Sequence, residues 1–267
     1  MAPLTLTILG AGPAAPNRDG ACSGYLVQQD GTAVLMDCGS GIAGRLVRHL
    51  PPNRLHGVAI SHFHPDHYFD LVPLYYLLKF GDARPADLSP LLPLHVPPGG
   101  RAFLRELGQL ISEKPAMLED VFEVCEYAPG HAIPVGDLSF TFHAVQHYIP
   151  SHAMRVRGRS GETLVFSSDV APCYQLVDAA READLFMCES ALLDATEDEL
   201  DPSKRGHMSA REAGTAAREA GVRQLMLTHF RSTESLDQHH RDAASRTFGG
   251  PVELAREGKE YQITASS

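Results

Sequence analysis

Cysteines are few in this sequence, and none has the spacing of a redox or metal-binding pair. The five residues are an odd number without a C-x-x-C motif; they are Cys22, Cys38, Cys125, Cys173 and Cys188. A chain of 267 residues is long enough to bury a core without disulfide bonds. We therefore predict reduced thiols in a cytoplasmic protein and exclude a cysteine-based zinc site.

Positive charge and long hydrophobic runs are also scarce. The chain has 23 Lys and Arg against 33 Asp and Glu, which gives a formal net charge of -10. Proteins that grip a polyanion usually carry a basic face, so such a face could exist here only locally. The longest apolar stretch, residues 71–78, contains a proline and is too short to span a bilayer. The first residues lack the basic region of a signal peptide, so we expect no membrane partner.

The order of the expected elements favours one large domain, or two halves that share one core. Strands dominate the first two thirds, and the last third alternates helices with strands. We expect strands at 4–9, 25–29, 33–36, 57–60, 94–96, 122–127, 138–145, 154–157, 164–167, 185–188 and 224–228. We expect helices at 69–80, 102–111, 174–183, 209–220 and 234–246, and a loop rich in Pro and Gly over most of 81–100. This order predicts two sheets packed face to face and flanked by helices.

Residues 60–67 read Ile-Ser-His-Phe-His-Pro-Asp-His and hold four ligand-type side chains, His62, His64, Asp66 and His67. In an extended segment, alternation would place His62, His64 and Asp66 on one side. Four ligands this close in sequence rarely reach a single ion, but two neighbouring ions can share them. Neutral imidazole suits Zn, Fe, Ni and Mn, and Asp66 can ligate, bridge or act as a base.

Three further candidates follow expected strands in the second half of the chain. His147, Asp169 and His229 each come just after such a strand, and strand ends are where a fold brings distant residues into one site. Each residue alone is a weak signal, but together they complete two sets of ligands. We predict that His62, His64 and His147 hold one ion, that Asp66, His67 and His229 hold the other, and that Asp169 bridges them.

The pattern His-x-His-x-Asp-His, followed by His, Asp and His at strand ends, resembles that of the metallo-β-lactamase superfamily. Segments 145–156, 166–172 and 225–230 resemble the ribonuclease Z-like branch, as do Ser23-Gly-Tyr-Leu and Asp37-Cys-Gly-Ser-Gly. The resemblance covers nearly the whole chain. It implies an α/β (α+β) fold, a four-layer αββα sandwich formed by a single domain over residues 1–267. It also implies two divalent metal ions, zinc first, with manganese or iron as alternatives.

The same resemblance implies an acid. Cys188-Glu189-Ser190 resembles the branch's His-Glu-Ala motif, and Gly206-His207-Met208-Ser209 resembles its His-Ser-Thr motif. In that branch the Glu and the His pair beside the metals, and the His protonates the leaving oxygen. The catalytic residues implied are thus Asp66, Glu189 and His207. The alternative is a helix-start His with no chemical role beside a buried Glu. The Cys188 position departs from the family but leaves the pair intact.

The most consistent function is that of a binuclear metal-dependent hydrolase, a phosphodiesterase acting on small phosphodiesters such as cyclic nucleotides. A ribonuclease Z that processes the 3′ side of tRNA is the first alternative. The tRNA substrate is disfavoured because the net charge is -10, residues 194–201 are acidic and no tRNA-gripping arm is found. An acyl hydrolase, a lactonase or β-lactamase-like enzyme, is the second alternative. A homodimer is compatible with the sequence.

Three more residues admit two interpretations each. Asp37 could support the loop of candidate ligands at residues 60–67 (the metal loop) or could bond backbone amides in a turn. His152 could contact substrate phosphate or could be an exposed strand residue. Arg155 could meet phosphate or could lie on the surface.

Overall fold

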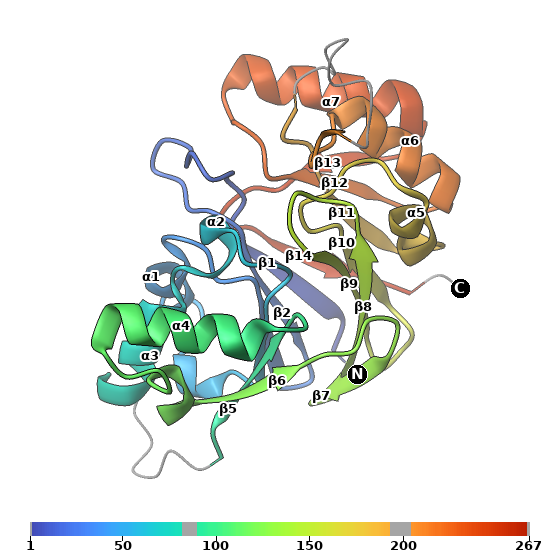
Figure 1. The fold of residues 1–267 in the computed structure, drawn as a ribbon. Coiled ribbons are helices and arrows are strands. Elements are labelled where there is room, and N and C mark those ends of the chain that lie inside the picture. Colours follow the sequence, from blue (N-terminus) through green and yellow to red (C-terminus); the bar gives the residue numbers. More distant parts are fainter. Residues whose placement is uncertain (1, 82–89, 193–203, 266–267) are drawn as a thin grey trace.

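Two seven-stranded sheets form the centre of the molecule (Figure 1). The computed structural model describes residues 2–81, 90–192 and 204–265; the loop residues 82–89 and the acidic segment 194–201 lie outside this range. The first sheet has the order β14-β1-β2-β3-β4-β5-β6, and the second has the order β13-β12-β11-β10-β9-β8-β7. The four-layer sandwich predicted from the sequence is therefore confirmed.

The strands and helices have the following bounds. The first sheet consists of β1 (Leu4–Gly10), β2 (Gly24–Gln29), β3 (Thr32–Met36), β4 (Gly57–Ala59), β5 (Leu92–Val96), β6 (Phe122–Glu126) and β14 (Glu260–Ile263). The second consists of β7 (Ala132–Val135), β8 (Leu138–Val145), β9 (Ser151–Arg157), β10 (Thr163–Phe166), β11 (Leu185–Glu189), β12 (Leu225–Thr228) and β13 (Val252–Leu254). The α-helices are α1 (Ile42–Leu46), α2 (Pro65–Tyr68), α3 (Leu71–Phe80), α4 (Gly100–Ser112), α5 (Tyr174–Ala180), α6 (Ala210–Ala220) and α7 (Glu234–Phe248); short 3-10 helices span Pro52–Arg54 and Leu118–Asp120.

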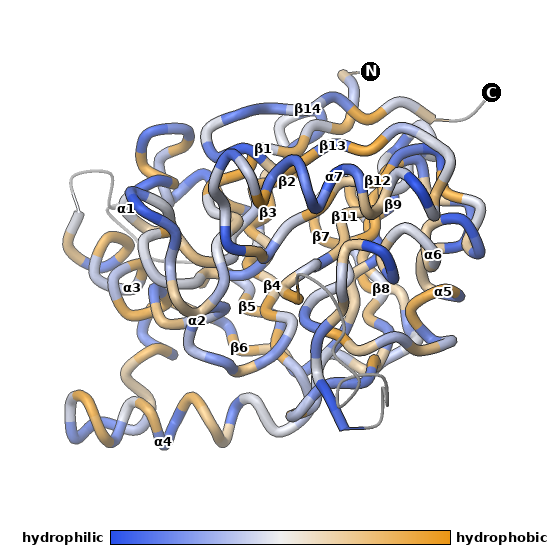
Figure 2. The backbone as a smooth tube through the Cα atoms, turned by 90° about the horizontal axis from the view of Figure 1, so that it is seen from above, coloured by the Kyte–Doolittle hydropathy of each residue, from blue (hydrophilic) through white to orange (hydrophobic). Residues whose placement is uncertain are grey.

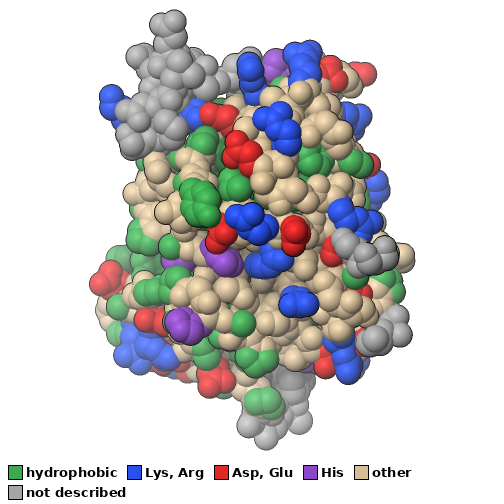
Figure 3. All heavy atoms as spheres, turned by 90° about the vertical axis from the view of Figure 1, so that its right-hand side faces the viewer, with side chains coloured by type: hydrophobic (Ala, Val, Ile, Leu, Met, Phe, Trp, Pro, Cys, Tyr) green, Lys and Arg blue, Asp and Glu red, His purple; other side chains and the backbone are tan. Residues whose placement is uncertain are grey.

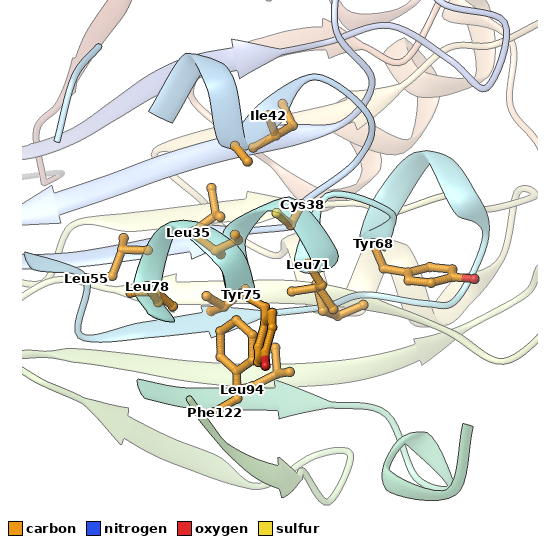
Figure 4. Packing of buried hydrophobic residues seen from close by; sticks show 14 of the residues in the cluster. Leu35, Cys38, Ile42, Leu55, Tyr68, Leu71, Tyr75, Leu78, Leu94 and Phe122 are labelled. Atoms are coloured by element: carbon orange, nitrogen blue, oxygen red, sulfur yellow. The ribbon is translucent and has the colours of Figure 1, made fainter. Parts of the chain in front are cut away.

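Alternation within the strands builds three layers of apolar side chains. Tyr25 and Val27 of β2 point into the core between the sheets, while Leu26 points to the layer under α1, α3 and α4. Figure 4 shows that outer layer, in which Leu71, Tyr75 and Leu78 of α3 pack over strand residues such as Leu35 and Leu94. The third layer lies between the second sheet and helices α5, α6 and α7. Both sheets are thus buried on two faces, which favours continuous apolar strands.

The outer helices are amphipathic, and the hydrophobic colour concentrates in the central strands (Figure 2). Along α4 and α7 the tube alternates between hydrophilic and hydrophobic positions, as expected for helices with one face on a sheet. Within the described ranges, no helix combines the length and hydrophobicity that crossing a bilayer requires.

Strand direction places the carboxyl ends of several strands near one another. In the first sheet β3, β4, β5 and β6 run parallel, and in the second β10, β11, β12 and β13 run parallel. Loops that leave the same ends of parallel strands meet at one edge of the sheet, where binding sites of such folds are built. The candidate site residues lie in the segments that follow β3, β4, β8, β10, β11 and β12, and at the last residue of β11.

The structure corrects two local expectations. The loop after β4 is extended only through His64, because Pro65 begins α2, so Asp66 does not continue the alternation of His62 and His64. The expected helix 69–80 is confirmed as α3, which begins at Leu71, and α2 is a separate short helix that precedes it. Strand β7 was not expected, and it contains Pro134; it lies at the edge of its sheet, where proline is tolerated.

One close backbone approach leads to a stability prediction. Gly39 lies against the metal loop, and a Cβ atom there would be 1.9 Å from the carbonyl oxygen of Asp66. We expect Gly39→Ala to lower the free energy of unfolding by about 1–3 kcal/mol or more, because the loop must shift. Urea denaturation measures the change.

Gly44→Ala is the matched control. Gly44 is in α1, and a Cβ atom added there would meet no other atom within 4 Å. Alanine there should stabilise the protein by about 0.5–1 kcal/mol through helix propensity. Equal effects of the two substitutions would show that the contact with Asp66 is not what requires glycine at position 39.

Candidate metal centre and acid

The seven side chains expected to bind metal come together in two groups that share one carboxylate. One group is His62, His64, His147 and Asp169, and the other is Asp66, His67, Asp169 and His229. Within each group the ligand-type atoms lie within 4.8 Å of one another. Their arrangement matches the assignment expected from the sequence, although ligation itself stays a prediction.

Hydrogen bonds fix the orientation of three imidazoles. His67 Nδ1 lies 2.7 Å from Asp37 Oδ2, and His147 Nδ1 lies 2.6 Å from the carbonyl oxygen of Gly206. His62 Nδ1 lies 3.0 Å from Ser61 Oγ. A carboxylate or carbonyl can only accept, so the Nδ1 atoms of His67 and His147 must donate. In the neutral ring, the Nε2 atom then carries the free electron pair that a metal ligand requires. Burial lowers the pKa of His67, but the charges of Asp169 and Asp37 outweigh burial and raise it well above its ordinary value, so His67 would release a proton when it binds a cation.

The nitrogen atoms that face the centre fit a cation. His64 Nδ1 lies 3.2 Å from His62 Nε2 and 3.0 Å from His147 Nε2. One shared proton could satisfy only one of these contacts, so lone pairs face each other there unless a cation lies between them. In the second group, His67 Nε2 and Asp169 Oδ1 are buried without a hydrogen-bond partner among the described residues. Buried polar atoms are rarely left unpaired in this way.

The two oxygen atoms of Asp169 face different groups. Oδ2 lies 3.7 Å from His62 Nε2 and 3.9 Å from His147 Nε2. Oδ1 lies 3.2 Å from His67 Nε2 and 3.5 Å from His229 Nε2. Divided in this way, one carboxylate can bridge two cations.

Burial keeps the first group of imidazoles neutral. Desolvation lowers the pKa of His62 well below its ordinary value and lowers that of His147 to about 4. Burial also lowers the pKa of His64. Neutral imidazole is the form that binds metal, so these three residues need lose no proton near neutral pH to bind one.

A third carboxylate, that of Asp37, supports the metal loop. Asp37 is fully buried, and besides His67 it accepts hydrogen bonds from the backbone N–H and the hydroxyl of Ser61, both at 2.8 Å. Of its two interpretations, support of the metal loop fits these contacts, because Asp37 orients one candidate ligand directly and a second through Ser61.

Glu189 and His207 form the expected pair beside the second group. Glu189 Oε1 lies 3.0 Å from His207 Nδ1, and Glu189 is completely buried. The same carboxylate accepts hydrogen bonds from the backbone N–H groups of Val170, Ala191 and Met208. His207 keeps 24% of its side chain exposed and lies 4.0 Å from Asp169 Oδ2.

The pair favours a protonated His207. Burial lowers its pKa, but the hydrogen bond and the charge of Glu189 outweigh burial and raise the pKa to about 9. Because Nδ1 is engaged by Glu189, the proton available for transfer is on Nε2. A charged, partly exposed imidazole beside a metal site is suited to donate a proton to a bound molecule.

The structure also shows where His152 and Arg155 lie, the other two residues with two interpretations each. His152 is neither exposed nor directed at the centre: it is buried, its ring packs edge-on against Tyr127, and its Nδ1 lies 3.4 Å from the Ser61 carbonyl. Arg155 donates to the carbonyl oxygens of Ala179 and Arg181 at and just beyond the end of α5. The phosphate contacts considered for both residues are therefore not supported by their positions.

Sequence reasoning missed several residues that orient the candidate ligands. They are Ser61, Ser151 and Ser168 with their hydroxyls, and Gly206 with its carbonyl. Only the adjacency of Ser61 to His62, and of Gly206 to His207, could have signalled two of them.

Comparisons with known proteins agree with this geometry. A family model described as "Beta-lactamase superfamily domain" matches residues 32–230. An uncharacterized protein of Mycobacterium leprae is 33% identical over 97% of this chain and 89% of its own length. A ribonuclease Z of Myxococcus xanthus is 28% identical over 98% of this chain and 99% of its own.

A solved structure gives the same result. The crystal structure of the metallo-β-lactamase fold protein YhfI from Bacillus subtilis superposes with a TM-score of 0.83. It is 27% identical and covers 98% of this chain and 100% of its own. The fold, the paired ligand groups and these similarities lead to one conclusion: the chain belongs to the metallo-β-lactamase superfamily, in its ribonuclease Z-like branch, and is a metallo-hydrolase of that fold.

Proposed function

We propose that this protein is a binuclear phosphodiesterase that cleaves small phosphodiesters such as cyclic nucleotides. The observation that carries the proposal is the Glu189–His207 pair, 3.0 Å apart, beside the two groups of candidate ligands. A phosphodiester with an alkoxide leaving group needs a proton at the departing oxygen, and a histidine held by a carboxylate can supply it.

In this proposal each residue has a defined part. His62, His64 and His147 hold one divalent ion, Asp66, His67 and His229 hold the other, and Asp169 joins the two sets. Zinc is the first choice, with manganese or iron as alternatives. When bound, the two ions would supply Lewis acidity toward a phosphoryl oxygen and would lower the pKa of a water molecule. Glu189 fixes the tautomer of His207, and His207 Nε2 gives its proton to the leaving oxygen.

Charge favours a small substrate. The chain carries a net charge of -10, which opposes a large polyanion at physiological salt. On the face drawn in Figure 3, basic and acidic side chains are interspersed, and no continuous basic surface is seen there. A small anionic diester needs only local positive charge at the centre itself.

Two other functions remain as alternatives. The similarity to ribonuclease Z over nearly the whole chain favours tRNA 3′ processing as the second candidate. An acyl hydrolase is the third, because the same metal chemistry serves acyl carbon, but it has less need of the Glu189–His207 pair.

Turnover of four substrates under identical conditions tests the proposal. We expect bis(p-nitrophenyl) phosphate and cyclic AMP to be hydrolysed, and precursor tRNA and a simple lactone to be poor substrates. Efficient 3′ cleavage of precursor tRNA at nanomolar enzyme would instead identify a ribonuclease Z. A lactone turned over fastest would identify an acyl hydrolase.

Removal of the shared carboxylate should empty the centre. We expect wild-type protein to bind close to two equivalents of metal, and Asp169→Ala to lose metal and nearly all activity, because Asp169 offsets the repulsion between two cations. Elemental analysis after gel filtration measures this. Asp178→Ala, which removes an exposed carboxylate of α5, is the matched control and should keep both ions. Unchanged metal content in Asp169→Ala would contradict the bridging role.

Removal of the acid should affect substrates selectively. We expect His207→Ala to slow cyclic AMP hydrolysis by roughly two to four orders of magnitude, the usual contribution of a general acid. p-Nitrophenolate is a good leaving group, so bis(p-nitrophenyl) phosphate turnover should fall much less, with metal content intact.

His239→Ala, at an exposed histidine of α7, controls for the loss of an imidazole and should leave both rates unchanged. Equal losses on the two substrates in His207→Ala would mean that His207 binds or orients substrate. No loss on either would leave it without a chemical role.

A further inference from the structure

Ser168 adopts a backbone conformation that serine rarely adopts. It lies between the end of β10 and Asp169, it is fully buried, and its φ is 57°. The left-handed region brings Cβ against the following carbonyl oxygen, so glycine is the usual residue there, and Asn or Asp the usual exceptions. A buried serine in this conformation needs a compensating interaction.

The surrounding backbone fixes this turn on both sides. Ser167 N–H donates to the carbonyl of Met187 at 2.9 Å, and Ala171 N–H donates to the carbonyl of Gln146 at 2.7 Å. Between them, Val170 N–H donates to Glu189 Oε1 at 2.7 Å. Glycine at position 168 could adopt the same positive φ without strain, so the backbone conformation alone does not explain why a serine is present.

The hydroxyl of Ser168 is where the compensation lies. Its Oγ is 3.3 Å from His62 Nδ1 and 2.9 Å from Ser151 Oγ. Ser151 Oγ in turn donates to the carbonyl of Asp169 at 2.9 Å. With Ser151 donating there, Ser168 donates to Ser151 and is left to accept from His62 Nδ1–H. The hydrogen bonds then run in one direction from His62 to the backbone of Asp169.

Ser61 does not make this contact redundant. Its Oγ lies closer to His62 Nδ1, at 3.0 Å, but its own proton is directed at Asp37 Oδ2. Ser61 therefore ties His62 to the support of the second group, whereas Ser168 ties it to Asp169. The two hydroxyls approach the same N–H and together hold its ring plane.

We propose that Ser168 is a positioning residue, which holds the proton on His62 Nδ1 and couples the orientation of His62 to that of Asp169, so that the two present their ligand atoms to the same cation. The inference rests on the proposed metal centre. The strained backbone conformation at Ser168 is retained because it positions the hydroxyl beside His62 Nδ1.

Two substitutions separate the hydroxyl from the strain. Ser168→Ala removes the hydroxyl and keeps Cβ, whereas Ser168→Gly removes both. We expect both variants to bind zinc about tenfold more weakly in competition with a chromophoric chelator, the lower end of the usual effect of a residue that orients a ligand. At saturating zinc, Ser168→Gly should melt several degrees above Ser168→Ala, because only glycine relieves the strain.

Activity toward bis(p-nitrophenyl) phosphate provides a readout that general destabilisation would not give. In both variants this activity should rise toward the wild-type rate as excess zinc is added. The zinc concentration that gives half of the maximal rate should be about tenfold higher than for the wild type. Glu113→Gly is the matched control, because Glu113 also has a positive φ of 54° but is exposed at the end of α4. It should raise thermal stability and leave zinc affinity unchanged.

The outcomes distinguish this inference from the proposed function. Wild-type zinc affinity in Ser168→Gly, with two ions bound, would overturn the positioning role and leave the metal centre standing. Weak binding in Ser168→Ala alone would assign the effect to strain and also overturn it. A wild-type protein that binds no zinc would remove the metal centre itself.

Discussion

The buried carboxylate of Asp169 is the point on which the rest of the site depends. Ring nitrogens of five histidines, from β-strand ends and loops far apart in sequence, lie within 4.0 Å of its oxygens: His62, His67, His147, His207 and His229. Burial raises the pKa of Asp169, but the charges of His229 and His67 outweigh burial and lower the pKa well below its ordinary value. A buried anion needs positive charge around it, and the histidines that surround Asp169 come from loops of both sheets.

Much of this architecture could be predicted from the sequence because its signals are local. The hairpin of β2 and β3 follows from Asp30-Gly31, where both residues have positive φ in a tight turn. The histidine-rich loop after β4 and the single His or Asp after β8, β10 and β12 are also readable, because strand ends of a two-sheet fold converge. The match between those residues and the two observed groups comes from that convergence.

Interactions that depend on tertiary geometry could not be predicted from the sequence. Ser61 and Ser168 are ordinary serines in sequence, and only the fold brings both hydroxyls to one ring nitrogen of His62. His152 illustrates the opposite failure: five residues after His147 it looked available to substrate, yet its strand direction buries it against Tyr127. A small rotation of the strand decides whether such a polar side chain faces the site or the core. The spacing of apolar residues in the sequence does not reveal that rotation.

The hydrogen bond between His147 and Gly206 has a consequence for the order in which the site is assembled. The carbonyl that accepts from His147 Nδ1 belongs to the residue just before His207, so a candidate metal ligand is hydrogen-bonded to the peptide unit that leads into the proposed proton donor. A cation bound to His147 would withdraw electron density from its ring, so the Nδ1–H would donate a stronger hydrogen bond to that carbonyl. In the proposed function, His207 would thus be held most firmly once a cation is in place, and its readiness to donate a proton would depend on metal occupancy.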